Sequence, residues 1–407
     1  MRNASAQHVC EPRRVAPQAA WVPGVMSRMS RMSRMRVTSV SSVTSLSILM
    51  GLALGLGGCV GPSSSGPSNE WSSKQRSSSY AAAAQRPMAP ASSRPQGQIA
   101  VEADGDARTT ALRILAQASD SSSPLLRANA IEALSSDPAA ARPAIQRGLV
   151  DSNRGVRFVS AMSAGNTRMG DLAAEIKPML RDEFPSVRAA AIFALKRCGQ
   201  PVDPTPLAAM SLSEDPEVRG NAVFVLGELG NPTAIPLLEG ALGRGLHLTN
   251  EARVRLVELQ VAEAQVKLGN ERAADPIRAA LFAPPEQAEL VILACQIAGR
   301  VKDGRSVTFL ERLVMADGPD QRPDEIRLAA LQALAEIGAA PSEAAALASE
   351  IALSPRADLR GQAATTLGAL GGAEAMAAVT RLLQDSDPVV QVAAAGAVVR
   401  LTTDGRD

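Results

Sequence analysis

A two-helix pattern recurs along most of this 407-residue chain and constrains its fold more than any other feature. The clearest copy, which starts at Asp215, reads DPEVRGNAVFVLGELGNPTAIPLLEGAL. Asp215-Pro216 marks a helix start, because the carboxylate can accept a hydrogen bond from a free backbone N–H and proline fits the first helical position. Apolar residues then recur at helical spacing up to Gly230, and Asn231-Pro232 begins a second helix in the same way. Two helices of about 10–14 residues cannot bury both apolar faces alone, so each copy needs neighbours of the same kind.

Each copy contains a marker residue, usually an arginine that follows Val, Leu or Ile, near the start of its first helix. A small residue stands three positions after the marker and, in most copies, a large apolar residue stands seven positions after it. The clear markers are Arg127, Arg157, Arg188, Arg219, Arg327, Arg360 and Gln391. Two degenerate copies fit in the longest interval between these markers. If Gly269 and Gly299 close them, their markers fall at Glu258 and Ala288. Arg255 offers a competing register for the first of the two.

The pattern D-P-x-V-R-x-x-A-x-x-x-L-G-x-L-G followed by a second helix resembles the short bacterial HEAT repeat, the subtype named after phycobilisome lyases. The resemblance covers residues 106–403, about nine copies at 30- to 39-residue spacing. It implies an all-α fold, a right-handed α-solenoid or superhelix, with first helices on the convex side and second helices lining the concave side. The composition agrees, because the chain is 46% hydrophobic but only 2% aromatic, which predicts an aliphatic core.

Residues 1–58 are predicted to be a signal peptide region. A Met-Ser-Arg repeat supplies positive charge, and the apolar run Leu46–Leu56 follows it. That run is shorter than the about 20 residues that a spanning helix needs, so a permanent transmembrane helix is the weaker interpretation. The expected translation start is one of Met26, Met29, Met32 or Met35.

The signal region ends in Leu56-Gly57-Gly58-Cys59, which resembles the bacterial lipobox. The resemblance implies cleavage between Gly58 and Cys59 and acylation of Cys59, which would anchor the chain stably in a membrane. Because Val60 is not an aspartate, an outer-membrane destination in the cell envelope, facing the periplasm, is favoured over the inner membrane. Residues 59–105 are then the lipidated cysteine and a disordered Ser/Pro/Ala-rich tether, and residues 106–407 are the solenoid.

Charge and residue types exclude several function classes. Residues 1–58 hold seven arginines and one glutamate, so the remaining chain has a net charge of about −5 and no basic block. Nucleic-acid binding is therefore excluded. The resemblance also extends to enzymes that bind two irons through His-Glu pairs, but here His8 precedes Val9 and His247 precedes Leu248, which excludes that activity. We expect no catalytic residue, no cofactor and no metal site.

The remaining cysteines, Cys198 and Cys295, belong to copies three apart, which is too far for a disulfide. The last predicted helix, Pro388–Leu401, raises a different question, because it is apolar nearly all round. Either Thr402–Asp407 covers it, or a second copy of the chain or another partner does.

Candidate partner-binding residues fall into two groups. Two inserted loops, Gly243–Asn250 and Ala316–Pro323, are predicted to project from one edge, either as a binding edge or as tolerated loop growth. The loops contribute Arg244, His247, Asp317, Asp320 and Arg322, and the predicted concave side contributes Lys177, Glu239, Arg278, Arg312 and Arg381.

Together these features predict a membrane-anchored, non-catalytic protein–protein interaction scaffold. The alternative is a lyase-like or chaperone-like protein that holds a small ligand in its concave groove. A cluster of convergent polar groups with perturbed pKa values in that groove would favour the alternative.

Overall fold

The computed structural model describes residues 103–242 and 251–404, which belong to a single unit of the chain. These residues form α-helices and short 3₁₀ turns and no strand, which confirms the predicted all-α solenoid. The marker helices are α3 (Pro124–Leu134), α5 (Arg154–Asn166), α7 (Pro185–Arg197), α9 (Pro216–Leu229), α11 (Glu251–Lys267), α13 (Ala288–Arg300), α15 (Asp324–Ile337), α17 (Ala357–Leu370) and α19 (Pro388–Asp404).

A second helix follows most marker helices, often entered through a 3₁₀ turn. These second helices are α4 (Pro138–Gly148), α6 (Ala173–Ile176), α8 (Pro206–Met210), α10 (Ile235–Ala241), α12 (Ala274–Ala280), α14 (Val307–Met315), α16 (Ala344–Ile351) and α18 (Gly372–Leu382). The N-terminal helix α2 (Ala103–Ala118) precedes the first marker helix. The 3₁₀ turns are η1 (Gly170–Leu172), η2 (Lys177–Arg181), η3 (Pro232–Ala234), η4 (Glu271–Ala273), η5 (Pro285–Gln287), η6 (Gly304–Ser306) and η7 (Gly318–Asp320).

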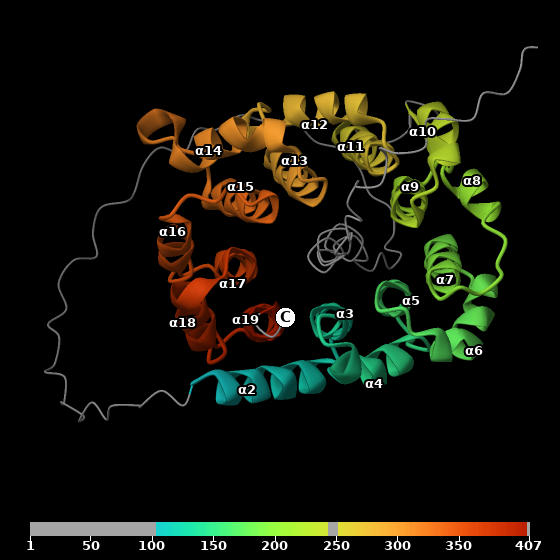
Figure 1. The fold of residues 1–407 in the computed structure, drawn as a ribbon, viewed down its shortest axis with the longest axis horizontal. Helices are drawn as coiled ribbons and strands as arrows, with labels where there is room; N and C mark the ends of the chain where they lie inside the picture. Colours follow the sequence, from blue (N-terminus) through green and yellow to red (C-terminus); the bar gives the residue numbers. More distant parts are fainter. Residues whose placement is uncertain (1–102, 243–250, 405–407) are drawn as a thin grey trace, which may run out of the picture. The chain divides into compact units, whose positions relative to one another are not determined.

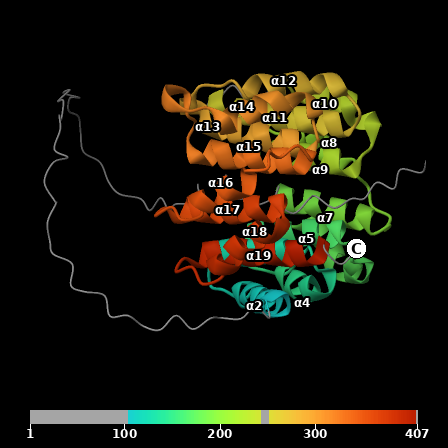
Figure 2. The same cartoon turned by 60° about the vertical axis from the view of Figure 1, so that its left-hand side comes forward.

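The marker helices form the inner layer of the array, and the second helices form the outer layer (Figures 1 and 2). The prediction that second helices line the concave side is therefore wrong. The reason is close packing between successive marker helices. A Cβ added at Gly227 of α9 would lie 2.9 Å from the Cα of Ala264 on α11, and Gly299 of α13 meets Ala333 of α15 at the same distance. Small residues shorten the spacing of this layer, so the array curves towards it.

The array closes on itself. The last marker helix, α19, packs against α17 on one flank and against α3 and α2 on the other (Figure 1). Arg108 of α2 donates hydrogen bonds from Nη1 to the Val399 carbonyl (3.2 Å) and to the Thr402 and Thr403 hydroxyls (2.6 and 3.1 Å). Its Nη2 donates to Asp137 Oδ2 at 2.5 Å. The N-terminal helix α2 thus supplies the second helix that the unit of α19 lacks, which makes nine units within the described residues.

Closure changes the expectation for the C-terminal helix. The apolar residues Val390, Val398 and Val399 of α19 are fully buried by neighbouring helices of the same chain. The apolar face of residues 388–401 is therefore covered within the same chain. It no longer gives a reason to expect a homodimer through this helix.

The marker arginines connect consecutive units. Arg360 Nη1 donates to the carbonyls of Ser354 and Pro355, in the loop before its own helix. Its Nε and Nη2 bind both carboxylate oxygens of Asp385, in the next such loop, at 2.7 and 2.8 Å. The pairs Arg127–Asp151 and Arg157–Asp182 repeat this geometry. A bidentate pair of this kind fixes both distance and orientation between neighbouring units.

Backbone geometry corrects one predicted register. A left-handed residue ends marker helices eleven positions after the marker, as at Gly230. In the unit of α13 that residue is Lys302, with φ of 53°, and Gly299 lies inside the helix. The marker position is therefore Val291, not Ala288. The Glu258 register is correct. With that marker, Ala264 lies six positions after its marker and packs against Gly227 of the preceding marker helix, as Ala333 packs against Gly299 and Ala397 against Gly368.

Candidate functional site

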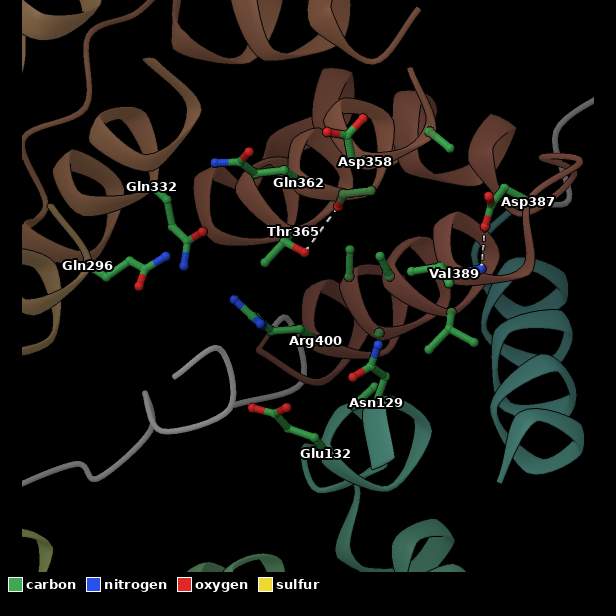
Figure 3. Close-up of a pocket in the computed structure, with 17 residues that line it drawn as sticks. Asn129, Glu132, Gln296, Gln332, Asp358, Gln362, Thr365, Asp387, Val389 and Arg400 are labelled. Carbon is green, nitrogen blue, oxygen red and sulfur yellow. Dashed lines mark hydrogen bonds between the residues drawn. The ribbon is translucent and has the colours of Figure 1, made fainter. Parts of the chain in front are cut away.

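A cavity of about 550 Å³ lies on the inner wall of the array and crosses the seam between the two ends of the chain (Figure 3). Most of its seventeen lining residues come from α3, α13, α15, α17 and α19. It exists only because α19 lies beside α3, so the closure builds it.

Small and apolar residues line the seam side of this cavity. Val392, Ala393, Gly396 and Ala397 of α19 lie there beside Ala133 of α3. A Cβ at Gly396 would lie 2.9 Å from the Cβ of Ala133. The same small residues that allow close helix packing therefore leave a surface that another backbone can approach closely.

Amide side chains line the wall on both sides of that surface. Asn129, Gln296, Gln332 and Gln362 project towards the cavity from four different helices (Figure 3). Gln332 Nε2 donates to Glu336 Oε1 at 2.9 Å, and Gln362 Nε2 donates to the Glu325 carbonyl at 2.7 Å. A primary amide has two donor hydrogens and an acceptor oxygen, so each can form further hydrogen bonds to a ligand.

Four charged residues also line the cavity. Glu132 of α3 and Arg400 of α19 extend from the two sides of the seam (Figure 3). Asp387 Oδ1 accepts a hydrogen bond from the Val389 N–H at 2.8 Å, so it caps α19. Asp358 pairs with Arg356, and the hydrogen bond from that guanidinium lowers the pKa of Asp358. Asp358 is therefore ionised at neutral pH and is a poor general acid.

The residue types of the lining favour binding over proton transfer. None of the seventeen lining residues is His, Cys, Lys or Tyr. Amides are neither protonated nor deprotonated near neutral pH, and two of the carboxylates are engaged in helix capping or an ion pair. The arrangement offers neutral hydrogen-bonding groups around an apolar surface.

Away from the cavity, the marker helices α9, α11 and α13 share a buried network of charged side chains. Glu263 of α11 accepts hydrogen bonds from Arg300 of α13 at 2.6 and 2.7 Å and pairs with Lys267 at 2.7 Å. Lys267 also pairs with Glu228 of α9. Burial alone would raise the pKa of Glu263, but the two cations hold it at about 2. For Lys267, burial would lower the pKa, but the two glutamates raise it.

This network joins three successive units and was not predicted. The signal in the sequence is a charged residue at the end of each of three successive marker helices, the acidic Glu228 followed by the basic Lys267 and Arg300. Nothing in a single unit indicates that these ends meet. All three side chains are at most 20% exposed, so the network stabilises the array and is not a surface for a partner.

The residues predicted from sequence lie elsewhere. Arg244 and His247, and also Gly58 and Cys59, fall outside the described residues. Asp317 and Asp320 are exposed around η7, and Arg322 is half-buried beside them. The residues predicted for the concave side all lie in the outer layer instead, namely Lys177, Glu239, Arg278, Arg312 and Arg381.

Among those outer residues, Arg278 has a structural role. Its guanidinium binds both carboxylate oxygens of Asp303 at 2.7 and 2.8 Å and pairs with Asp275 at 2.8 Å. Arg312 and Arg381 are exposed. None of the five residues predicted for the concave side lines the cavity.

Both described cysteines are free thiols, as predicted. Burial raises the pKa of Cys295 to about 12, and burial and the Asp171 carboxylate raise the pKa of Cys198 despite the opposing charge of Arg197. Within 103–242 and 251–404, no group of three or more His, Cys, Asp or Glu side chains is placed to hold a metal ion. No helix in the same residues is both long and apolar enough to span a bilayer.

Comparison with known proteins identifies the repeat. A family model described as HEAT repeats matches residues 172–247, from the end of η1 into the first inserted loop. The chain contains HEAT repeats. This match and the helical architecture confirm the prediction of HEAT repeats, and the short bacterial subtype stays a prediction. No functionally curated protein matches the chain significantly.

Several solved structures resemble the HEAT-repeat array at low identity. Human deoxyhypusine hydroxylase is 15% identical over 73% of this chain and 98% of its own, with a TM-score of 0.32. The CpcE–CpcF complex of phycocyanin lyase from Nostoc sp. is 19% identical over 61% of this chain and 91% of that chain, with a TM-score of 0.29. A mutant of the karyopherin Kap121p is 14% identical over 73% of this chain but only 38% of its own, with a TM-score of 0.29.

Proposed function

We propose that this protein is a non-catalytic interaction scaffold of the bacterial cell envelope, which binds an extended segment of a partner protein on the inner wall of its HEAT-repeat ring. The observation that supports this most directly is the cavity at the seam, where amide side chains surround a small-residue surface. HEAT-repeat arrays present such curved, continuous surfaces to partners.

The chemistry of the wall matches a peptide backbone. A peptide group offers one N–H donor and one carbonyl acceptor, and a primary amide can bond to both. The small residues of α19, Gly396 and Ala397, allow that backbone to approach closely. The wall therefore suits an extended chain without a requirement for strong charge on the ligand.

Photocrosslinking can test this wall. A photoreactive residue at Gln362, inside the cavity, should form an adduct with one partner segment, whereas the same residue at Arg381, exposed on the outer layer, should not. The double variant Gln296→Ala with Gln332→Ala should weaken the Gln362 adduct while circular dichroism stays unchanged. Adducts from the outer position alone would refute binding at the inner wall.

Membrane anchoring is the second part of the proposal. It is supported by the lipobox-like Leu56–Cys59 and by the Ser/Pro-rich residues that precede α2. A flexible tether of about 45 residues would have a reach of about 35–40 Å from a bilayer. An intact-mass spectrum from the host membrane fraction should show an N-terminus at Cys59 with acyl mass, and Cys59→Ala should abolish both. A full-length, unmodified chain in the soluble fraction would refute the anchor.

The volume of the cavity favours one alternative. At about 550 Å³ it lies within the range of sites that enclose small molecules. In this case the protein would be a lyase-like or chaperone-like carrier of a small ligand. Native mass spectrometry of protein purified from its host distinguishes the two. A bound small molecule that is lost in Gln296→Ala with Gln332→Ala would favour the carrier, and its absence together with a peptide adduct would favour the scaffold.

A further inference from the structure

Six exposed apolar side chains occupy equivalent places in the HEAT-repeat ring. Each lies at or just after the end of a second helix, where the chain turns back towards the next marker helix. We call this set the apolar rim: Val150, Leu212, Leu242, Phe282, Met315 and Leu353. Their exposed fractions lie between 43% and 77%. Since all units run in the same direction, these turns share one edge of the ring.

The regularity of the apolar rim is what requires an explanation. Single exposed apolar residues are common on soluble proteins. Here, however, every large apolar side chain that the described residues expose belongs to the rim, except Val389 on the inner wall. Five of the six come from consecutive units, α8 to α16, and Phe282 extends the surface by an edge-on contact with Phe309 of α14, 4.9 Å between ring centres.

Acidic side chains flank the apolar rim. Glu214 follows Leu212, Glu286 follows Phe282, and two exposed aspartates follow Met315 in the second inserted loop. None of these four carboxylates forms an ion pair with another described residue. Two cations lie in the described turns of this arc: Arg356, which is paired with Glu325 and Asp358, and the half-buried Arg322 of the second inserted loop, so the acidic side chains outnumber the free positive charge. A partner for this edge therefore needs apolar side chains next to positive charge.

The length of the arc indicates what kind of partner segment fits. Nine units complete the ring, so five consecutive units follow nearly half of it, and a straight helix contacts only about three neighbouring units (Figure 1). Helix layers in such arrays stack about 8–10 Å apart, so three neighbouring units span at least about 16–20 Å. A helix that rises about 1.5 Å per residue covers that span with roughly 11–14 residues. An acidic membrane surface would repel this edge, whereas a cationic helix would be attracted to it.

We propose that the apolar rim binds a cationic amphipathic helix of a partner protein. This inference rests on the proposed scaffold role but uses a surface separate from the inner wall. A negative result for the rim can therefore be distinguished from a negative result for peptide binding at the inner wall, because the wall is tested separately by photocrosslinking at Gln362 and Arg381.

The test uses the full chain and a labelled 14-residue model helix of leucine and lysine, with a leucine–glutamate helix as the charge control. The rim variant combines Leu212→Ser, Phe282→Ser, Met315→Ser and Leu353→Ser. The matched control combines Lys177→Ser, Glu239→Ser, Glu311→Ser and Arg381→Ser on the outer layer, which leaves the net charge unchanged, as the rim variant does. All eight side chains are exposed, so both variants should keep the wild-type circular dichroism.

Fluorescence anisotropy should show at least tenfold weaker binding of the leucine–lysine helix by the rim variant and a change of less than threefold for the control. The leucine–glutamate helix should not bind. Equal binding by the rim variant would refute the proposal, because attraction by charge alone survives these substitutions. Binding of phosphatidylglycerol vesicles that is lost with the rim would also refute it, in favour of a membrane surface.

Discussion

Removing the carboxylate of Glu263 should destabilise the HEAT-repeat ring more than any exposed charge change. Glu263 is 4% exposed and bonds to Arg300 and Lys267 at 2.6–2.7 Å. Its pKa is about 2, against an ordinary value of 4.5. A difference of about 2.5 pKa units at about 1.4 kcal/mol per unit corresponds to roughly 3 kcal/mol of stability at pH 7. Glu263→Gln keeps the shape but removes the buried anion that Arg300 and Lys267 share, and Lys267 then keeps only Glu228, so we expect a loss of about 3 kcal/mol.

The pH dependence of this loss follows from the direction of the shift. A carboxyl whose pKa is lower in the folded state stabilises that state above its unfolded pKa, and the stabilisation disappears as pH falls through the folded pKa. The difference in unfolding free energy between wild type and Glu263→Gln should therefore be full above pH 5 and about half as large near pH 3.

Urea unfolding followed by far-UV circular dichroism measures both effects. The control is Glu251→Gln, because Glu251 pairs with Arg255 at 79% exposure and such pairs contribute about 0–1 kcal/mol. Equal, small losses of unfolding free energy in Glu263→Gln and Glu251→Gln would refute the claim that the buried network stabilises the protein. A large loss for Glu263→Gln that is constant from pH 7 to pH 3 would refute the linkage argument.

Three further substitutions test the packing rules of the array. Lys302→Gly should stabilise the protein by about 0.5–1 kcal/mol in thermal unfolding, because lysine at φ of 53° is strained and glycine is not. Gly227→Ala should destabilise it by about 1–3 kcal/mol, because the new Cβ would lie 2.9 Å from the Cα of Ala264. Gly240→Ala is the matched control and should stabilise by about 0.5–1 kcal/mol, since nothing lies within 4 Å and alanine is the better helix former. Stability changes of the same sign for Gly227→Ala and Gly240→Ala would contradict the packing account.

The repeat and its helices could be predicted because each depends on residues close in sequence. Asp215 and Pro216 start a helix through local backbone geometry and hydrogen bonding, and the prediction at Asp215 agrees with the hydrogen bonds that its side chain accepts from the Glu217 and Val218 N–H groups. The left-handed end of α13 was harder to predict, since Lys302 takes the place where five other units have glycine, as Arg168 does after α5. A single substituted position shifted the predicted marker by three residues.

The curvature and the closure could not be predicted from a single unit. Which layer becomes the inner one depends on the contact between Gly227 and Ala264, on different units. Closure depends on Arg108 reaching Val399, which lies 291 residues away in the sequence. The cavity follows from that closure, so its residues were missed, and the predicted concave residues lie in the outer layer.

The inner wall, the cavity and the unbroken ring all depend on the contact between α19 and α3, so this contact is the most direct test. Ala133→Cys with Gly396→Cys places two thiols at adjacent Cβ positions, in a chain whose four native cysteines, Cys10, Cys59, Cys198 and Cys295, are replaced by serine. Gly227→Cys with Ala264→Cys is the control for neighbouring units, which pack together whether or not the ring closes. Mild oxidation followed by peptide mass mapping should show an intramolecular disulfide in both monomers, formed at similar rates. Formation in the control pair alone, or a 133–396 bond found only between two chains, would contradict closure.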